Sequence, residues 1–338
     1  MMMRATDILS YLPDFVIRFF IHIVLTYNLY ILKRYRGPCE ENEPATSTSD
    51  KDANFTLGLE NEIPEMFYAC HYGANMMSYG GKWSSSSKLT LTEAETSMLT
   101  QIESRLDLDT LEDGSRILDI NCTWGAIIIY LAKKYPHLLF TGVSTSTDYT
   151  NYITTHIDGL TNIDISGSPE THIYSRIIAI DTLYHTDNYT DMFDNINSLL
   201  TDDGFLYLQS ITHRENTIKL TDTAILSRFV KGSYNIPALN KLYRYQDHLT
   251  IKNIFCSYGT HTARTINYWL HNLSNNKEMI VSSLFPTKPY IYEQWRLLYL
   301  IYSECLQCNS GREFVVSTYI MTKKLNNKES QVDVATST

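Results

Sequence analysis

Short apolar runs alternate with amphipathic segments through the middle of the chain. The runs typical of buried strands lie at residues 116–120, 138–144, 174–180 and 204–211. Between them, apolar positions follow a helical spacing, most clearly at 127–135. Strands that alternate with helices in this way predict an α/β fold with a doubly wound, mostly parallel sheet. Ligands of such sheets bind outside the carboxyl ends of the strands, so we expect the functional loops to start at Asp119, Ser144, Asp181 and Ser210.

The loop after the first of these strands has the outline of a nucleotide-cofactor turn, although most of its glycines are replaced. Glycines in such a turn allow positive φ and let a cofactor approach the backbone closely. Here Asn121 and Thr123 occupy the glycine positions, and only Gly125 is kept. Asparagine tolerates the left-handed region, whereas a β-branched threonine does so poorly and its side chain occupies space. The pattern therefore predicts the path of the loop and leaves its ligand open.

The two ends of the chain differ from the middle in composition. Residues 12–32 are apolar, but a membrane-spanning helix would place Arg18 and His22 in hydrocarbon. We favour a packed amphipathic helix within residues 1–36 and keep membrane association as the alternative. Residues 37–56 are polar and contain prolines, which is typical of a flexible linker. A main domain at 57–324 and a disordered tail at 325–338 complete the division.

The composition of the chain bears on its domain size, its partners, its compartment and its metal content. With 338 residues, 43% of them hydrophobic, the chain can bury one sizeable α/β core. A net charge of −9 argues against nucleic acid as a partner. Six scattered cysteines predict no disulfide framework and a reducing, cytoplasmic location. Cys305 and Cys308 form a lone C-x-x-C, for which buried thiols are favoured over a zinc site, so no metal is expected.

Seven segments resemble one family in collinear order. They are LPDFVIR (12–18), IPEMF (63–67), LTLTEAE (89–95), LDINCTWG (118–125), IDTLYHTDNY (180–189), YGTHTART (258–265) and EQWRLLYLIYSECL (293–306). The chain resembles the S-adenosylmethionine-dependent methyltransferases of the coclaurine N-methyltransferase and cyclopropane-fatty-acyl-phospholipid synthase group. This resemblance implies a Rossmann-like class I methyltransferase fold, S-adenosylmethionine as cofactor, and an inserted helical lid at about residues 214–250.

The resemblance also implies a set of cofactor-binding positions. Asp119 matches the acidic residue before the glycine loop, Gly125 the last glycine, and Asp164 a carboxylate near the adenine amino group. The other implied positions carry substitutions: Tyr79 for a serine, Asn121 and Thr123 for glycines, and Thr145 and Tyr149 for an asparagine and a glutamine. Structural alternatives stay open, since Asp119 can cap the following turn and Asp164 can be a solvated loop residue.

Four positions fall within the catalytic elements of the family, and three of them match its residues. Asp181 and His185 match an acidic residue and the histidine after the fourth strand, and His261 matches the histidine of a later motif. Tyr184 replaces the glutamate just before that histidine. Lone histidines are often structural, so that alternative also stays open. Tyrosine, with a pKa of about 10, is a poor base at neutral pH, which leaves Asp181 and His185 as the anion and base.

Two functions from different classes follow. The first is methyl transfer to a small amine or a lipid-like acceptor, a reaction that requires a deprotonated, desolvated nucleophile held in line with the methyl carbon. Lipid cyclopropanation is less favoured, because the family's glutamate is lost at Tyr184. The second is a catalytically inactive pseudo-methyltransferase that serves as a binding or scaffold protein. Oligomeric state and membrane-surface contact through residues 12–32 stay open.

Aromatic residues cluster in the last matching segment. The positions of Tyr290, Tyr292, Trp295, Tyr299 and Tyr302 follow a helical face. Such a face either packs in the core of a cap subdomain, which we favour, or forms an aromatic cage around a substrate.

Overall fold

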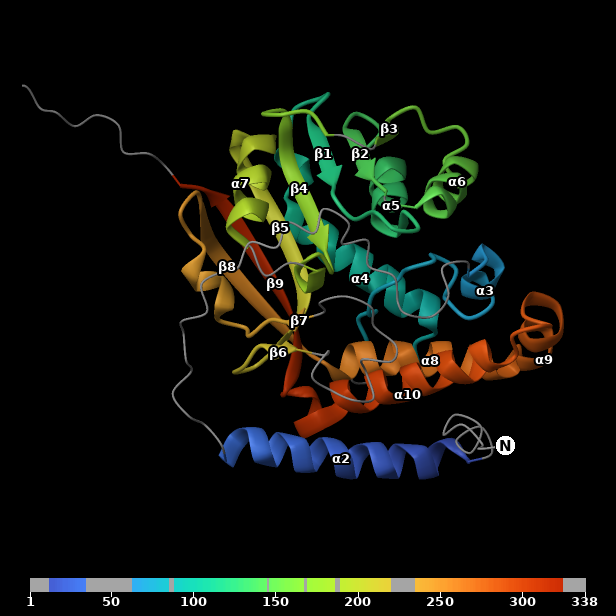
Figure 1. Cartoon of the computed structure of the whole chain (residues 1–338). Helices are drawn as coiled ribbons and strands as arrows, with labels where there is room; N and C mark the ends of the chain where they lie inside the picture. Colours follow the sequence, from blue (N-terminus) through green and yellow to red (C-terminus); the bar gives the residue numbers. More distant parts are fainter. Residues whose placement is uncertain are drawn as a thin grey trace, which may run out of the picture.

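A computed structural model describes residues 12–34, 63–84, 88–144, 146–166, 169–185, 189–219 and 235–324. In this part of the chain, one sheet of seven strands has the order β3-β2-β1-β4-β5-β9-β8 (Figure 1). Its strands are β1 (Arg116–Asp119), β2 (Leu139–Val143), β3 (Ile163–Ser166), β4 (Tyr174–Ile180), β5 (Leu200–His213), β8 (Leu249–Tyr258) and β9 (Phe314–Lys323). The first five strands pair in parallel, and β9 is antiparallel to β5 and β8. The predicted doubly wound, mostly parallel sheet is confirmed.

Helices cover both faces of this sheet. α4 (Leu91–Leu106), α5 (Ala126–Lys134) and α6 (Thr147–His156) contribute to the core on one face, and α7 (Tyr189–Leu199) to the core on the other. Successive strand residues alternate between the faces, so Ile117 of β1 packs in the first core and Leu118 in the second. This alternation fixes the direction of every side chain near the carboxyl ends of the strands.

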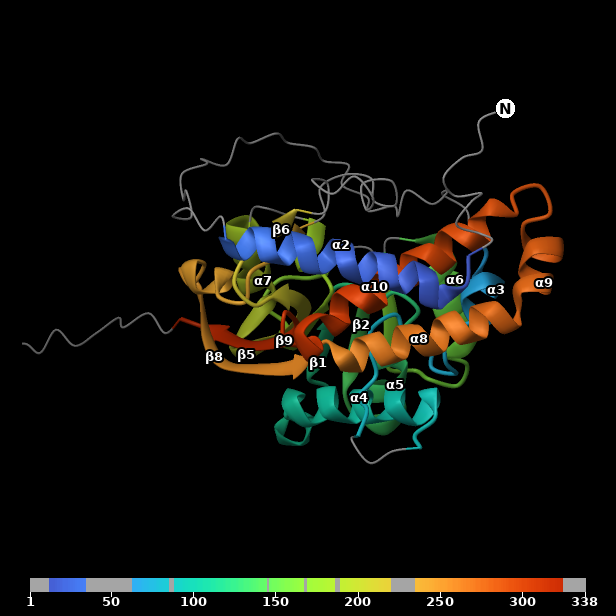
Figure 2. The same ribbon diagram turned by 90° about the horizontal axis from the view of Figure 1, so that it is seen from below.

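A layer of helices closes the end of the sheet to which the parallel strands point (Figure 1). It contains α2 (Asp14–Arg34), α3 (Glu65–Ala69), α8 (Thr260–Asn275) and α10 (Tyr290–Gly311). Seen from below, α10 runs between α2 and α8 (Figure 2). Short elements complete the described part: η1 (Leu108–Thr110), η2 (Leu183–His185), β6 (Ile218–Lys219), β7 (Asn235–Ile236), η5 (Lys241–Arg244), α9 (Lys277–Met279) and η6 (Ile280–Leu284).

The aromatic residues of α10 belong mostly to the core of this helical layer. Tyr292, Trp295 and Tyr299 are buried, and the rings of Trp295 and Phe67 lie 5.2 Å apart between centroids. Only the first of the series, Tyr290, is well exposed. The core-packing interpretation of this segment is supported over an open aromatic cage.

The N-terminal helix packs on the domain, as we favoured. Ile17 of α2 is buried in the core of the helical layer. None of the helices in the described ranges is long and apolar enough to cross a membrane. The predicted linker at 37–56, the tail at 325–338 and residues 220–234 of the predicted lid lie outside the described residues. These divisions therefore stay predictions.

Candidate active site

Strand β1 delivers Asp119 to the carboxyl edge of the sheet. The side chain is buried, and its Oδ1 accepts a hydrogen bond from the backbone N–H of Asn121 at 3.1 Å. Burial raises the pKa of Asp119 to about 7, because a carboxylate loses its hydration there. The capping role that we considered for this residue is present, and it leaves an ionisable group in the interior.

The loop after β1 has glycine-like dihedral angles at two positions. Thr123 has a φ of 43° and Gly125 a φ of 78°. The hydroxyl of Thr123 lies 3.2 Å from that of Ser78, so the added side chain meets a partner from the preceding segment. Asn121 donates its side-chain N–H to the carbonyl of Ile180 at 2.8 Å. The loop thus keeps a left-handed path at a threonine, and its asparagine ties β1 to the end of β4.

Three cofactor-binding residues were predicted after β2 and β3, and the structure describes two of them, Tyr149 and Asp164. Tyr149 at the start of α6 meets Trp124 edge to face, with 4.5 Å between ring centroids. Asp164 is exposed on the edge strand β3, where it pairs with Thr141, two residues before the end of the pairing at Ser166. Its carboxylate therefore lies short of the carboxyl edge. Thr145 lies outside the described residues.

Tyr79 brings a buried phenol to the carboxyl edge. Its hydroxyl has no hydrogen-bond partner among the described residues. Burial raises the pKa of Tyr79 well above its ordinary value, and the charges of Asp119, Tyr207, Asp181 and Glu95 raise it further. The carboxyl groups of Asp119, Asp181 and Glu95 therefore lie near enough to this unpartnered hydroxyl to act on it electrostatically.

Glu95 is the member of this group that the sequence analysis did not select. It lies on α4, is fully buried, and accepts hydrogen bonds from the backbone and side-chain N–H of Asn75 at 3.3 and 3.0 Å. A Cβ at Gly73 would lie 2.1 Å from its Oε1, so a larger residue there would displace the carboxylate. Its sequence signal is a carboxylate at an apolar-face position of a helix, between Leu91 and Met98.

Asp181 occupies the turn after β4 in a strained conformation, with a φ of 56°. Tyr184 donates its hydroxyl proton to Oδ1 of Asp181 at 2.7 Å and accepts the backbone N–H of Ile211, also at 2.7 Å. Burial raises the pKa of Asp181 to about 6, and the bond from Tyr184 opposes that rise. The phenol at the place of the family's glutamate therefore orients the remaining carboxyl. His185 follows at the end of η2, and its side chain lies outside the described residues.

His261 lies on the first turn of α8. Its Nδ1 accepts the backbone N–H of Trp83 at 3.0 Å. Burial lowers the pKa of His261, and the neighbouring charges of Lys82 and Arg264 lower it further. The imidazole is therefore neutral at pH 7 and carries its proton on Nε2. The backbone N–H of Gly81 also bonds to Thr265 of this helix, at 2.9 Å, which docks the segment carrying Tyr79 on α8.

The structure therefore brings together part of the predicted site. The groups that face the carboxyl edge are Tyr79, Asp119, Asn121, Thr123, Gly125, Asp181 and Tyr184. In the described part of the chain, none of the three carboxyls around Tyr79 forms an ion pair with arginine or lysine. No group of histidine, cysteine, aspartate and glutamate among the described residues has the arrangement of a metal site.

Similar proteins carry this arrangement of elements. The family model described as mycolic acid cyclopropane synthetase matches residues 57–309. (S)-coclaurine N-methyltransferase of Papaver somniferum is 27% identical over 281 residues, which cover 78% of this chain and 79% of that protein. The S-adenosylmethionine-dependent methyltransferase UmaA of Mycobacterium tuberculosis is 24% identical over 266 residues, covering 72% of this chain and 85% of that protein.

Solved structures agree on the fold. A coclaurine N-methyltransferase bound to N-methylheliamine and SAH superposes with a TM-score of 0.77 at 23% identity, covering 93% of this chain and 97% of that one. The cyclopropane synthase MmaA2 from Mycobacterium tuberculosis gives 0.64 at 18% identity, covering 79% and 97%. The region matched by the family model contains six of the seven strands of the sheet, the loop after β1, α3, α8 and most of α10. The chain therefore belongs to the mycolic acid cyclopropane synthetase family of S-adenosylmethionine-dependent methyltransferases.

Proposed function

We propose that this protein transfers the methyl group of S-adenosylmethionine to the nitrogen of a small amine. The observation that carries the proposal is the set of carboxyls, buried at Asp119 and Glu95 and partly buried at Asp181, near the unpartnered hydroxyl of Tyr79. Buried anions are costly unless a cation compensates them. The described residues supply none by ion pairing, and the carboxyls do not form a metal-ligand cluster. A sulfonium cofactor and an ammonium acceptor would supply the compensating charge.

The residues of the β1–α5 loop are the proposed cofactor contacts. When bound, S-adenosylmethionine supplies an electrophilic methyl group. Asn121, Thr123 and Gly125 would lie along its path, with Asp119 and Tyr79 beside its charged end. Thr145, Tyr149 and Asp164 stay proposed cofactor contacts on the family resemblance alone.

Asp181 is the proposed proton acceptor for the amine. With a pKa of about 6, it is largely ionised at pH 7 and can accept a proton from an ammonium group. Tyr184 holds Oδ1 in place and its own proton points at that oxygen, so the phenol positions the base. We assign His185 to the same end of the site because it follows directly in the chain. The neutral His261 contributes an N–H donor from α8.

The relatives support an amine over a lipid as the acceptor. Several are named for N-methylation of alkaloid amines, including (S)-tetrahydroprotoberberine N-methyltransferase of Eschscholzia californica, which is 25% identical over 232 residues. Tyr184 at the place of the family's glutamate argues in the same direction. Lipid cyclopropanation is the less supported activity.

One observation favours a second function, that of an inactive binding or scaffold protein. The side chains that replaced glycines now bond within the protein, Asn121 to Ile180 and Thr123 toward Ser78. Such bonds stabilise the loop without a ligand. A protein of this kind would keep the fold and lose the affinity for the cofactor.

Transfer of a labelled methyl group separates the two functions. The full chain is incubated with S-adenosylmethionine labelled in its methyl group and with heliamine, the amine whose methylated form occupies the coclaurine N-methyltransferase structure. Label in the amine, reduced at least a hundredfold by Asp181→Asn, supports the proposal. Saturable cofactor binding without transfer to heliamine or to a panel of primary and secondary amines would contradict it.

We also propose that the protein works in the cytoplasm and that residues 12–32 contact a membrane surface. Scattered free thiols support the first statement. The surface of α2 supports the second.

A further inference from the structure

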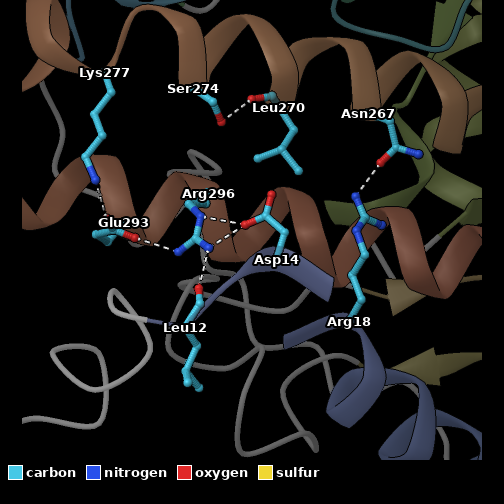
Figure 3. A network of polar contacts seen from close by, with 9 residues as sticks. All are labelled: Leu12, Asp14, Arg18, Asn267, Leu270, Ser274, Lys277, Glu293 and Arg296. Atoms are coloured by element: carbon cyan, nitrogen blue, oxygen red, sulfur yellow. Dashed lines mark hydrogen bonds and ion pairs between the residues drawn. The ribbon is translucent and has the colours of Figure 1, made fainter. Parts of the chain in front are cut away.

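The N-terminal helix α2 is fixed to the domain by its inner face. Arg296 of α10 pairs with Asp14 and donates to the carbonyl of Leu12 (Figure 3). Arg18 pairs with Glu304 at 2.6 Å. Arg18 also donates to Asn267 of α8 at 2.7 Å. Because these contacts reach two different helices, α10 and α8, they fix which face of α2 lies against the domain.

The outer face of α2 is apolar and exposed. Five large side chains lie there with 43% to 72% of their surface accessible: Phe15, Phe19, Phe20, Ile23 and Val24. We call these five residues the α2 stripe. The ion pairs of the inner face keep the α2 stripe turned away from the domain, because turning the stripe toward α10 would break the pairs of Asp14 and Arg18. A contiguous exposed apolar patch held in this way marks an interaction surface.

Charge indicates the kind of partner. Asp14 lies beside the stripe and is paired with Arg296, and the five stripe residues carry no charge. The sequence continues from the stripe to Lys33, Arg34 and Arg36, although the chain as a whole carries −9. An apolar face followed by basic residues is the pattern of helices that lie in the interface of an anionic bilayer. The acidic remainder of the protein would be repelled from the same surface, which orients the contact.

Other occupants fit less well. The five side chains expose on the order of 500 Å², short of the roughly 800 Å² that each partner buries in a standard protein interface. The segment RGPCEENEPATSTSDKDANFT at residues 36–56 is too polar to cover five apolar side chains. No described helix can span a membrane, so the contact is lateral.

We propose that the α2 stripe docks the protein on an anionic membrane surface, with α2 parallel to the bilayer and its phenylalanines in the headgroup region. This inference goes beyond methyl transfer, because it concerns where the reaction takes place. It also specifies the membrane contact through its residues and orientation.

Flotation with lipid vesicles tests the docking. The full chain and the double variant Phe15→Ser/Phe19→Ser are mixed with vesicles of phosphatidylcholine, with and without phosphatidylserine. The wild-type chain should float with the anionic vesicles, and the double variant should partition at least tenfold less. Met66→Ser, on α3, removes an equally exposed apolar side chain outside the stripe and should float like wild type. An unchanged unfolding midpoint shows that each variant is folded.

Three results would overturn the docking proposal. They are a wild-type chain that stays with the soluble fraction, equal binding to neutral vesicles, and equal binding by the double variant. Sedimentation velocity without lipid tests the remaining alternative, in which a second copy of the chain binds the α2 stripe. A dimer that the double variant abolishes would support that alternative. The assay needs neither cofactor nor amine, so its failure leaves the proposed methyl transfer untouched.

Discussion

At the scale of single residues, the backbone of the loop after β1 shows why one glycine is kept and what its threonine contacts. Gly125 was predicted from the turn pattern, and its φ of 78° shows why glycine is kept. Thr123 was expected to resist the left-handed region, yet it adopts a φ of 43° and places its hydroxyl beside Ser78. Glu95 was missed because its partner Asn75 is twenty residues away, a contact that local patterns do not report.

Replacing Gly125 by alanine should destabilise the protein by about 2–3 kcal/mol, through left-handed strain and a contact with the neighbouring helix. A Cβ there would lie 2.9 Å from Cγ1 of Ile153. Gly159 is the matched control, because its φ of 79° is the same and nothing lies within 4 Å of its added Cβ. Gly159→Ala should cost about 1 kcal/mol in urea unfolding. Equal losses would show that packing at α6 is not what Gly125 serves.

Tyr184→Phe should raise the pKa of Asp181 above its value of about 6, because the variant removes the hydrogen bond that stabilises the carboxylate. The base would then ionise at higher pH, so the acidic limb of kcat/KM should move to higher pH. Carbon-13 NMR of labelled aspartates, assigned with Asp181→Asn, measures the pKa without activity. A pKa that stays constant or falls would contradict the positioning role of Tyr184.

Asp119→Asn should stabilise the protein most above pH 7. The folded-state pKa of Asp119 is raised from 3.8 to about 7, so the folded protein holds the proton more tightly than the unfolded chain. The stabilisation that protonated Asp119 gives the folded protein is therefore fully present below pH 3.8. As the pH rises to 7, this part of the free energy of unfolding falls by up to about 4 kcal/mol. Urea unfolding at several pH values should show this fall in wild type and a flatter profile in the variant. A variant that is less stable than wild type at pH 8 would contradict the predicted stabilisation.

At the scale of secondary structure, the sequence predicted the elements and left their faces unassigned. The apolar run at 12–32 is helical, but both of its faces are apolar, so periodicity alone could not show which one packs. The choice is made by Asp14 and Arg18, whose partners Arg296 and Glu304 lie nearly three hundred residues away. Long-range pairs of this kind are visible only in the folded chain.

Arg296→Met should loosen α2 and leave the sheet intact. The variant removes the bonds to Asp14, Glu293 and the carbonyl of Leu12 while keeping an apolar stem of similar length. Amide hydrogen exchange over residues 14–25 should rise at least tenfold, and exchange in β1 and β4 should stay constant. Lys277→Met, which removes a partly exposed pair with Glu293 and a cation–π contact with Tyr292, is the control and should change neither. Unchanged exchange in α2 after Arg296→Met would show that apolar packing alone holds the helix.

At the scale of the whole molecule, alternation of strands and helices predicted the parallel core and the edge where the site lies. The segments after β5 were harder to place, because β9 comes from the end of the chain and inserts between β5 and β8. The helical layer that covers the site also combines segments from both ends of the chain (Figure 1). The result is a carboxyl edge where Asp119 at the end of β1, Asp181 in the turn after β4 and Glu95 on α4 act electrostatically on Tyr79.

Calorimetric titration with S-adenosylmethionine tests this arrangement most directly, performed at pH 6.5 in two buffers of different ionisation enthalpy. If the carboxyls compensate a sulfonium, binding should be saturable at one site, and the difference between the buffers should show protons released from Asp119 and Asp181. The absence of binding heat at millimolar cofactor in both buffers, or binding without proton release, would contradict the account.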